Sequence, residues 1–114
     1  MKNTENQLQG LLIKFNGKNI TTEIVTFSKE KKLEEFYDLL NCRTIDIVTD
    51  NKGNDIVVDD EGMLKSGNHV FQLNILEQPI AGNMLLFGKV DAEGNLTSYQ
   101  FDENIEIEVI GVVK

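Results

Sequence analysis

Residues 43–62 read Arg-Thr-Ile-Asp-Ile-Val-Thr-Asp-Asn-Lys-Gly-Asn-Asp-Ile-Val-Val-Asp-Asp-Glu-Gly, and this stretch decides the fold expected for the chain. Two alternating runs, 45–48 and 56–59, flank the turn-forming sequence Asn-Lys-Gly-Asn. Alternation on both sides of a glycine-containing turn is typical of a β-hairpin. The sequence therefore predicts two antiparallel strands joined at residues 51–54.

The alternation also predicts how the two strands pair. A four-residue loop at 51–54 places Ile47 opposite Val58 on the core side, which keeps the apolar residues together. The same register predicts two pairs of like charges that point away from the core: Asp46 opposite Asp59, and Asp50 opposite Asp55. Like charges that face each other cost on the order of a few tenths of a kcal/mol per pair, so this arrangement does not favour stability.

The chain has 114 residues and a net charge of −8, and its excess of acidic residues lies in the second part. Residues 1–42 contain six Lys and six Asp or Glu, whereas residues 43–114 contain five Lys or Arg and thirteen Asp or Glu. An acidic surface repels nucleic acid and attracts basic protein surfaces, and it also favours solubility. The candidate partner-binding residues lie in or beside the hairpin: Asp46, Asp50, Asp55, Asp59, Asp60 and Glu61.

Length and composition indicate one domain that spans residues 1–114, with residues 1–7 frayed. Cys42 is the only cysteine, which excludes an internal disulfide and is typical of a reducing cytoplasm, here that of a bacterial host. The N-terminus lacks the apolar segment of a secretory signal, and no apolar run approaches the ~20 residues of a membrane span. We therefore expect a cytoplasmic protein without membrane contact.

The first half of the chain predicts a strand pair followed by a helix. Residues 8–15 and 20–27 flank a turn at 16–19 and are expected to pair antiparallel. Ser28 is the expected N-cap of a helix that extends to Asn41. The apolar stripe of this helix has amphipathic spacing: Leu33, Phe36, Tyr37 and Leu40.

The second half predicts mainly strands. Residues 68–76 are expected to form a short helix that ends before Pro79, although their apolar residues also alternate as in a strand. The nearly continuous apolar run at 84–90 predicts a central strand buried on both faces, and residues 96–101 predict a short strand or a loop. The last strand is expected at 104–113, with three residues facing the core: Ile105, Ile107 and Val109.

These elements together predict an α+β domain. Its expected architecture is a mostly antiparallel sheet of about five to six strands with one main amphipathic helix packed on one face.

The order of these elements resembles a short domain of unknown function carried by bacteriophages and plasmids of Gram-positive bacteria. The motifs that carry the resemblance are Gly10–Ile13, Leu39–Asn41, Ile45–Val48, Asp60–Gly62 followed by Leu64-Lys65, and Gly82–Gly88. The resemblance covers about residues 10–100, and the strand expected at 104–113 departs from the helix-like ending of that domain. It implies no settled activity. Mobile elements also carry small acidic inhibitors of host defence, including type II anti-CRISPR proteins, so the resemblance adds support to inhibition.

Charge and resemblance together predict a non-enzymatic inhibitor encoded by a mobile element, with no cofactor. Its acidic face would bind a basic surface of a defence nuclease, such as a Cas9-type effector, and compete with guide RNA or DNA. Alternate residues of a strand lie roughly 6.6–6.8 Å apart, so two adjacent strands can display carboxylates at a density comparable to that of nucleic-acid phosphates. The expected partner is therefore a basic protein rather than nucleic acid itself.

Two other classes of function stay open. The second hypothesis is a metal-dependent enzyme acting on nucleic acid, with Lys65 nearby and four carboxylates as ligands: Asp46, Asp59, Asp60 and Glu61. The third is an accessory protein that binds a small molecule such as a signal nucleotide, which the many carboxylates disfavour. His69 and Cys42 are each the only residue of their type, too few for a zinc site, and no glycine-rich phosphate-binding motif occurs.

Overall fold

Two antiparallel sheets and one α-helix make up the part of the chain that the computed structural model describes, residues 7–100 and 104–114. The elements in chain order are β1 (Gln7–Phe15), β2 (Ile20–Ser28), α1 (Lys32–Leu40), β3 (Ile45–Thr49), β4 (Asn54–Asp59), a 3₁₀ turn (Gly62–Leu64), β5 (His69–Leu73), β6 (Ile80–Ala81), β7 (Met84–Lys89) and β8 (Ile107–Val112). The larger sheet has the order β2-β1-β7-β4-β3, and the smaller one has the order β6-β5-β8. The α+β class is confirmed, but the described strands form two sheets instead of the single sheet of five to six strands that was expected.

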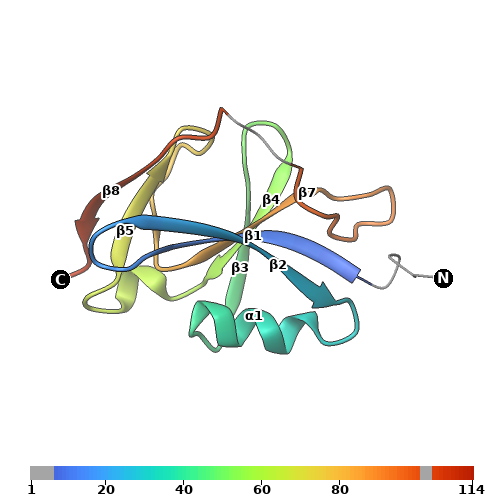
Figure 1. Cartoon of the computed structure of the whole chain (residues 1–114), viewed down its shortest axis with the longest axis horizontal. Helices are drawn as coiled ribbons and strands as arrows, with labels where there is room; N and C mark the ends of the chain where they lie inside the picture. Colours follow the sequence, from blue (N-terminus) through green and yellow to red (C-terminus); the bar gives the residue numbers. More distant parts are fainter. Residues whose placement is uncertain (1–6, 101–103) are drawn as a thin grey trace.

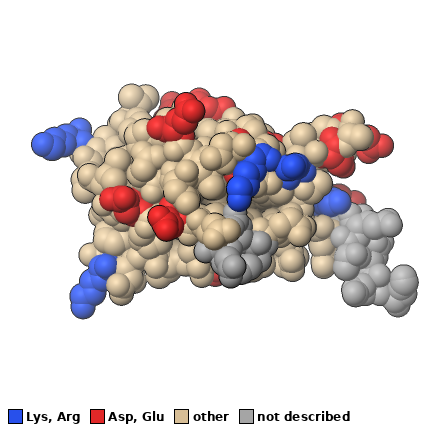
Figure 2. All heavy atoms as spheres, turned by 90° about the horizontal axis from the view of Figure 1, so that it is seen from above, with Lys and Arg blue, Asp and Glu red and all other residues tan. Residues whose placement is uncertain are grey.

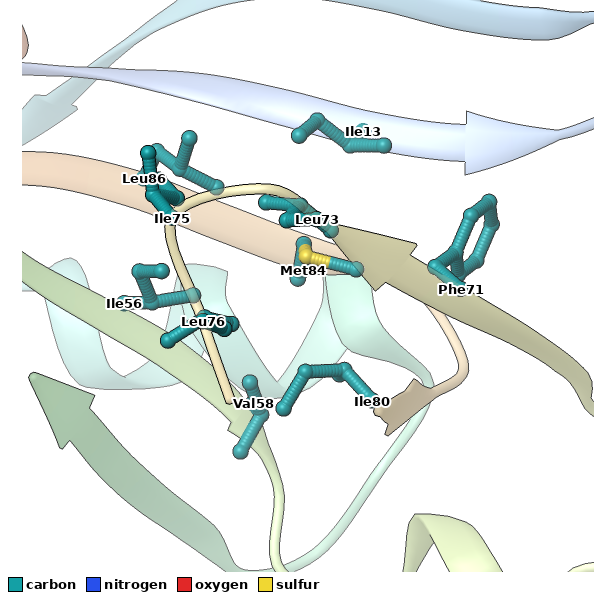
Figure 3. Close-up of a cluster of buried hydrophobic side chains, with 10 residues drawn as sticks. All are labelled: Ile13, Ile56, Val58, Phe71, Leu73, Ile75, Leu76, Ile80, Met84 and Leu86. Carbon is teal, nitrogen blue, oxygen red and sulfur yellow. The ribbon is translucent and has the colours of Figure 1, made fainter. Parts of the chain in front are cut away.

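The larger sheet forms the middle layer, with α1 on one face and the smaller sheet on the other (Figure 1). Because neighbouring residues of a strand point to opposite faces, Leu12 packs on the helix side and Ile13 on the side of the smaller sheet. The helix-side cluster contains Leu8, Leu12, Phe27, Phe36, Leu40, Val57, Leu85 and Phe87. Figure 3 shows the opposite cluster, which contains Ile13, Ile56, Val58, Phe71, Leu73, Ile75, Leu76, Ile80, Met84 and Leu86.

The larger sheet is covered on both faces, by α1 and by the smaller sheet, which explains why its central strands are apolar on both faces. Residues 84–88 of β7 are all buried, and β7 lies between β1 and β4, so the central strand predicted at 84–90 is confirmed. The expected pairing of the first two strands is also confirmed, because β1 and β2 pair along their full length, from Gln7 with Ser28 to Phe15 with Ile20.

The helix is shorter than predicted. Ser28 ends β2, and its side chain accepts a hydrogen bond from the Glu30 N–H (3.3 Å) in the connecting turn rather than at the helix start, which is Lys32. Phe36 is buried as expected, but Leu33 falls in the first turn and is exposed. The helix ends at Leu40 and is capped by Asn41, whose φ of 52° is left-handed, and the Cys42 N–H donates to the Tyr37 carbonyl.

The helix expected at 68–76 is wrong, because residues 69–73 form β5. This strand pairs with β8, which lies more than 30 residues further along the chain, and with β6. Long-range pairing is therefore what decides a segment whose local pattern fits both structures.

The C-terminal prediction is largely confirmed. β8 covers residues 107–112 of the expected strand, and three half-buried residues pack on the core: Ile105, Ile107 and Val109. Residues 96–100 form no regular strand, although the Gly88 N–H bonds the Thr97 carbonyl and the Tyr99 N–H bonds the Gln9 carbonyl. Residue 101 of that prediction and residues 1–6 of the terminus predicted to be frayed lie outside the described residues. The fraying predicted for residue 7 is wrong, because Gln7 belongs to β1 and pairs with Ser28.

Candidate functional site

The β3–β4 hairpin forms, but its register differs by one residue from the prediction. Ile47 lies opposite Val57 rather than Val58. The loop has three residues instead of four, because the Asp50 N–H donates to the Asn54 carbonyl (2.9 Å) and Gly53 adopts a φ of 89°. A glycine in this left-handed conformation closes a three-residue hairpin loop.

A shift of one residue exchanges the two faces of a strand. Ile45 packs on the helix-side cluster and Val48 on the opposite cluster, whereas Ile47, which was expected in the core, is exposed. The predicted like-charge pairs are wrong: Asp46 lies opposite Val58, Asp59 opposite Ile45, and Asp55 opposite Thr49.

The six candidate acidic residues therefore do not form one solvent-facing surface. Asp50, Asp55 and Asp59 are buried, with exposed fractions of 8%, 7% and 7%. The other three, Asp46, Asp60 and Glu61, are exposed. On the face shown in Figure 2, acidic side chains form separate groups with uncharged surface between them.

Two of the buried carboxylates hold the hairpin. Asp50 Oδ1 accepts hydrogen bonds from the N–H groups of Lys52 (2.8 Å) and Asn54 (2.9 Å), and its Oδ2 accepts one from Asn54 Nδ2 (3.2 Å). Asp55 Oδ1 accepts a hydrogen bond from Thr49 Oγ1 (3.2 Å) across the strand pair. These contacts stabilise the loop of the β3–β4 hairpin and the Thr49–Asp55 residue pair next to it.

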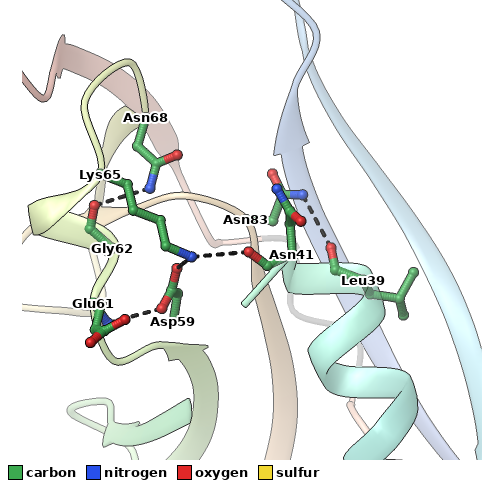
Figure 4. Close-up of polar contacts among 8 residues, drawn as sticks. All are labelled: Leu39, Asn41, Asp59, Glu61, Gly62, Lys65, Asn68 and Asn83. Atoms are coloured by element: carbon green, nitrogen blue, oxygen red, sulfur yellow. Dashed lines mark hydrogen bonds and ion pairs between the residues drawn. The ribbon is translucent and has the colours of Figure 1, made fainter. Parts of the chain in front are cut away.

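The third buried carboxylate, Asp59, joins three segments (Figure 4). Its Oδ1 accepts a hydrogen bond from the Glu61 N–H (2.9 Å), and its Oδ2 lies 2.7 Å from Lys65 Nζ. Lys65 Nζ also donates to the Asn41 carbonyl at the end of α1 (3.0 Å), where the helix dipole favours a cation. Sequence reasoning treated Lys65 only as a possible neighbour of a metal and missed this ion pair.

A cavity of about 140 Å³, here called the polar pocket, lies beside this ion pair. Its polar lining is Asn41, Asp59, Lys65, Asn68, His69 and Asn83. Asn68 Nδ2 donates to the Gly62 carbonyl (3.0 Å), and Asn83 Nδ2 donates to the Leu39 carbonyl (3.2 Å). The His69 ring packs edge-to-face against Phe15, with ring centres 4.6 Å apart.

Cys42 lies close to this region and is half-buried. Burial raises the pKa of its thiol, the negative charge of Asp59 raises it further, and the positive charge of Lys65 opposes both. The thiol therefore stays protonated at neutral pH. No group of three or more His, Cys, Asp or Glu residues is placed to hold a metal ion among the described residues.

The fold and the pocket define a small α+β protein in which the end of α1, the segment after the 3₁₀ turn and the start of β5 line a polar cavity. Over residues 9–108 the chain matches the family described as "Domain of unknown function (DUF3846)", and it belongs to that family. No curated protein and no solved structure matches the chain. Within residues 7–100 and 104–114, no helix is long and apolar enough to cross a membrane.

The motifs described above as resembling a known domain meet at this pocket. Leu39–Asn41 contributes the helix end, the segment that starts at Asp60–Gly62 contributes Lys65, and Gly82–Gly88 contributes Asn83. The hairpin that decided the predicted fold contributes only its last strand residue, Asp59. The pocket is therefore the place where most of these separated motifs come together.

Proposed function

We propose that this chain is a non-enzymatic inhibitor that binds a basic, nucleic-acid-binding surface of a host defence protein, such as a Cas9-type effector. The observation that carries the proposal is a group of three exposed carboxylates, here called the acidic corner: Asp46, Asp60 and Glu61. The net charge of −8 arises wholly after residue 42 and attracts a basic partner from a distance.

The register supports a shared surface for the first two of these carboxylates. The Asp60 N–H donates to the Thr44 carbonyl (3.1 Å), which extends the β3–β4 ladder by one residue pair. Since Asp46 lies opposite Val58, it is the diagonal neighbour of Asp60 on the same face, roughly 7–8 Å away. Two carboxylates at this spacing can engage separate Arg or Lys side chains.

Apolar residues follow the acidic corner directly. Met63 and Leu64 lie in the 3₁₀ turn and are exposed, Leu64 to 80%. An apolar centre beside charged residues is the usual composition of a protein interface. The segment from Asp60 to Leu64 therefore offers both charge and contact area to a protein partner.

The metal-enzyme hypothesis receives less support from the geometry. Of its four expected ligands, Asp59 is already bound by the Lys65 ammonium and by the Glu61 N–H. A metal ion at that carboxylate would have to compete with a bound cation. We therefore keep metal-dependent cleavage as the competing outcome of the experiment below.

The test is DNA cleavage by a purified Cas9-type nuclease, with the chain added before guide RNA, before DNA or after DNA. A competitor of nucleic acid inhibits most when it is added first. The variant Asp46→Asn/Asp60→Asn/Glu61→Gln should lose inhibition. A control with the same charge change, Glu93→Gln/Glu106→Gln/Glu108→Gln, should retain it, because these exposed residues lie on the 91–95 turn and on or beside β8.

Two results would contradict the proposal. One is inhibition that is unchanged in the acidic-corner variant, or absent at every order of addition. The other is cleavage of RNA or DNA by the chain alone in Mg²⁺ or Mn²⁺ that disappears in Asp60→Ala, which would support the enzyme hypothesis.

A further inference from the structure

The two asparagine side chains of the polar pocket have fixed orientations. Asn68 and Asn83 each use the amide NH₂ group to bond a backbone carbonyl, that of Gly62 and that of Leu39. Each amide oxygen then points away from the carbonyl that its NH₂ group binds (Figure 4), and both side chains line the pocket together with Lys65 and Asn41. The pocket therefore offers carbonyl-type acceptors from two walls and favours a ligand that donates hydrogen bonds.

The remaining walls favour a flat group. Phe15, Phe71 and Leu40 also line the cavity, and the His69 ring packs against Phe15. A volume of about 140 Å³ is well below the roughly 300–1,000 Å³ of sites that enclose whole drug-sized ligands. The pocket thus has room for one side chain or one small planar group.

The charge of the surroundings favours a cation over an anion. Asp59 and Lys65 compensate each other inside the pocket. The exposed carboxylates Asp60 and Glu61 follow Asp59 directly in the chain, and the whole chain carries −8. A phosphate or carboxylate would be repelled by this field, whereas a positive group would be attracted.

From these features we infer that the polar pocket receives the guanidinium group of an arginine side chain from the protein partner. A guanidinium is flat and positively charged, has five N–H donors and no acceptor, and stacks well on aromatic rings. A lysine ammonium has neither the flat shape nor the forked donors. That the arginine comes from a protein rests on the function proposed above.

The test is an NMR titration of ¹⁵N-labelled protein with three blocked tripeptides, Gly-Arg-Gly, Gly-Lys-Gly and Gly-citrulline-Gly. Citrulline keeps the flat shape and removes the charge. The expected result is a saturable shift of backbone amides at residues 65–69 and 82–83 with the arginine peptide, and affinity at least about tenfold weaker for the other two. Equal affinity for all three peptides, or no saturable shift, would overturn the inference.

Two variants of Asn83 separate ligand binding from a structural role. Asn83→Ala removes the acceptor oxygen, whereas Asn83→Asp retains acceptor oxygens and adds negative charge; both lose the bond to the Leu39 carbonyl. We expect Asn83→Ala to lose arginine binding by about tenfold and Asn83→Asp to keep or improve it. Equal losses in both variants would mean that Asn83 only supports the fold, and would contradict the inference.

Failure of this inference can be told apart from failure of the proposed function. If the partner binds wild type and Asn83→Ala equally but loses affinity for the acidic-corner variant, the proposed function holds and the arginine site is wrong. If no defence protein binds, the proposed function is wrong, and the peptide titration still reports on the pocket alone.

Discussion

The Lys65 ammonium lies 2.7 Å from the Asp59 carboxylate and 3.0 Å from the Asn41 carbonyl, so one side chain ties the end of β4 to the end of α1. The Asp59 side chain is only 3% exposed, whereas that of Lys65 is 37% exposed. The carboxylate therefore depends on this ion pair and on the Glu61 N–H for its compensation.

Replacing Lys65 should therefore destabilise the protein, because the buried Asp59 carboxylate loses its ion pair. Lys65→Met removes the counter-ion of a buried carboxylate, and we expect a loss of about 1–3 kcal/mol in the free energy of unfolding, lowered from the buried-pair range because Lys65 is partly in water. The measurement is urea denaturation at pH 7. The double variant Asp59→Asn/Lys65→Met should recover part of the loss. A single variant as stable as wild type would mean that solvent already screens the pair.

The reactivity of Cys42 should report on the same pair. Because Asp59 raises the pKa of the thiol and Lys65 lowers it, Asp59→Asn should shift the pH profile of alkylation to lower pH, and Lys65→Met should shift it to higher pH. Mass spectrometry of iodoacetamide-treated protein gives the rates. Identical profiles for the two variants would contradict the predicted opposite shifts.

The raised pKa of Cys42 also predicts in which direction the stability of the protein changes with pH. A group that binds its proton more tightly in the folded state stabilises the protein below its unfolded pKa, and this contribution is lost as pH rises through the folded value. Stability should therefore decline as pH rises above the usual thiol value of 9.0. In Cys42→Ala, denaturant melts across this range should show a smaller decline than in wild type.

The Asp50 side chain should stabilise the β3–β4 loop through its hydrogen bonds to the backbone. Asp50→Ala leaves two backbone N–H groups of the loop without their acceptor, and we expect a loss of about 1–3 kcal/mol. Asp50→Asn keeps an acceptor oxygen and should cost much less. The two variants are compared by thermal melting. Equal stability of Asp50→Ala and wild type would contradict the three-residue loop.

The close packing of Gly62 against β6 can be tested against an exposed glycine, Gly111 of β8. A Cβ on Gly62 would overlap the carbonyl oxygen of Ala81, whereas a Cβ on Gly111 meets nothing within 4 Å. Gly62→Ala should cost about 1–3 kcal/mol or more because backbone must move, and Gly111→Ala should be close to neutral. Denaturant melts of both variants provide the comparison, and equal costs would count against the close approach of the 3₁₀ turn to β6.

The parts of the structure that the sequence predicted correctly are those whose pattern lies within one short segment of the chain. The β1–β2 pair, the buried Phe36 and the apolar run of β7 follow from alternation, helical spacing and composition. The helix start was missed because Ser28 has the composition of an N-cap but caps a turn that precedes the helix.

The acidic hairpin shows what local patterns leave open. The register that pairs Ile47 with Val58 and the one that pairs it with Val57 both keep apolar residues together. The observed register goes with the left-handed conformation of Gly53 and with the hydrogen bonds of Asp50 in the loop, neither of which alternation predicts. The burial of Asp59 depends on Lys65 and on the end of α1, which come from other parts of the chain. The second sheet likewise depends on the pairing of β5 with β8.

The most direct test of the proposed function is the affinity of a Cas9-type effector for three proteins at low and physiological salt: wild type, the acidic-corner variant and the Glu93/Glu106/Glu108 control variant. If the acidic corner binds a basic surface, wild-type affinity should fall as salt rises. The acidic-corner variant should bind about tenfold more weakly, mainly through slower association, and the control should stay within about twofold of wild type. Equal affinity of all three proteins, without salt dependence, would contradict the proposal.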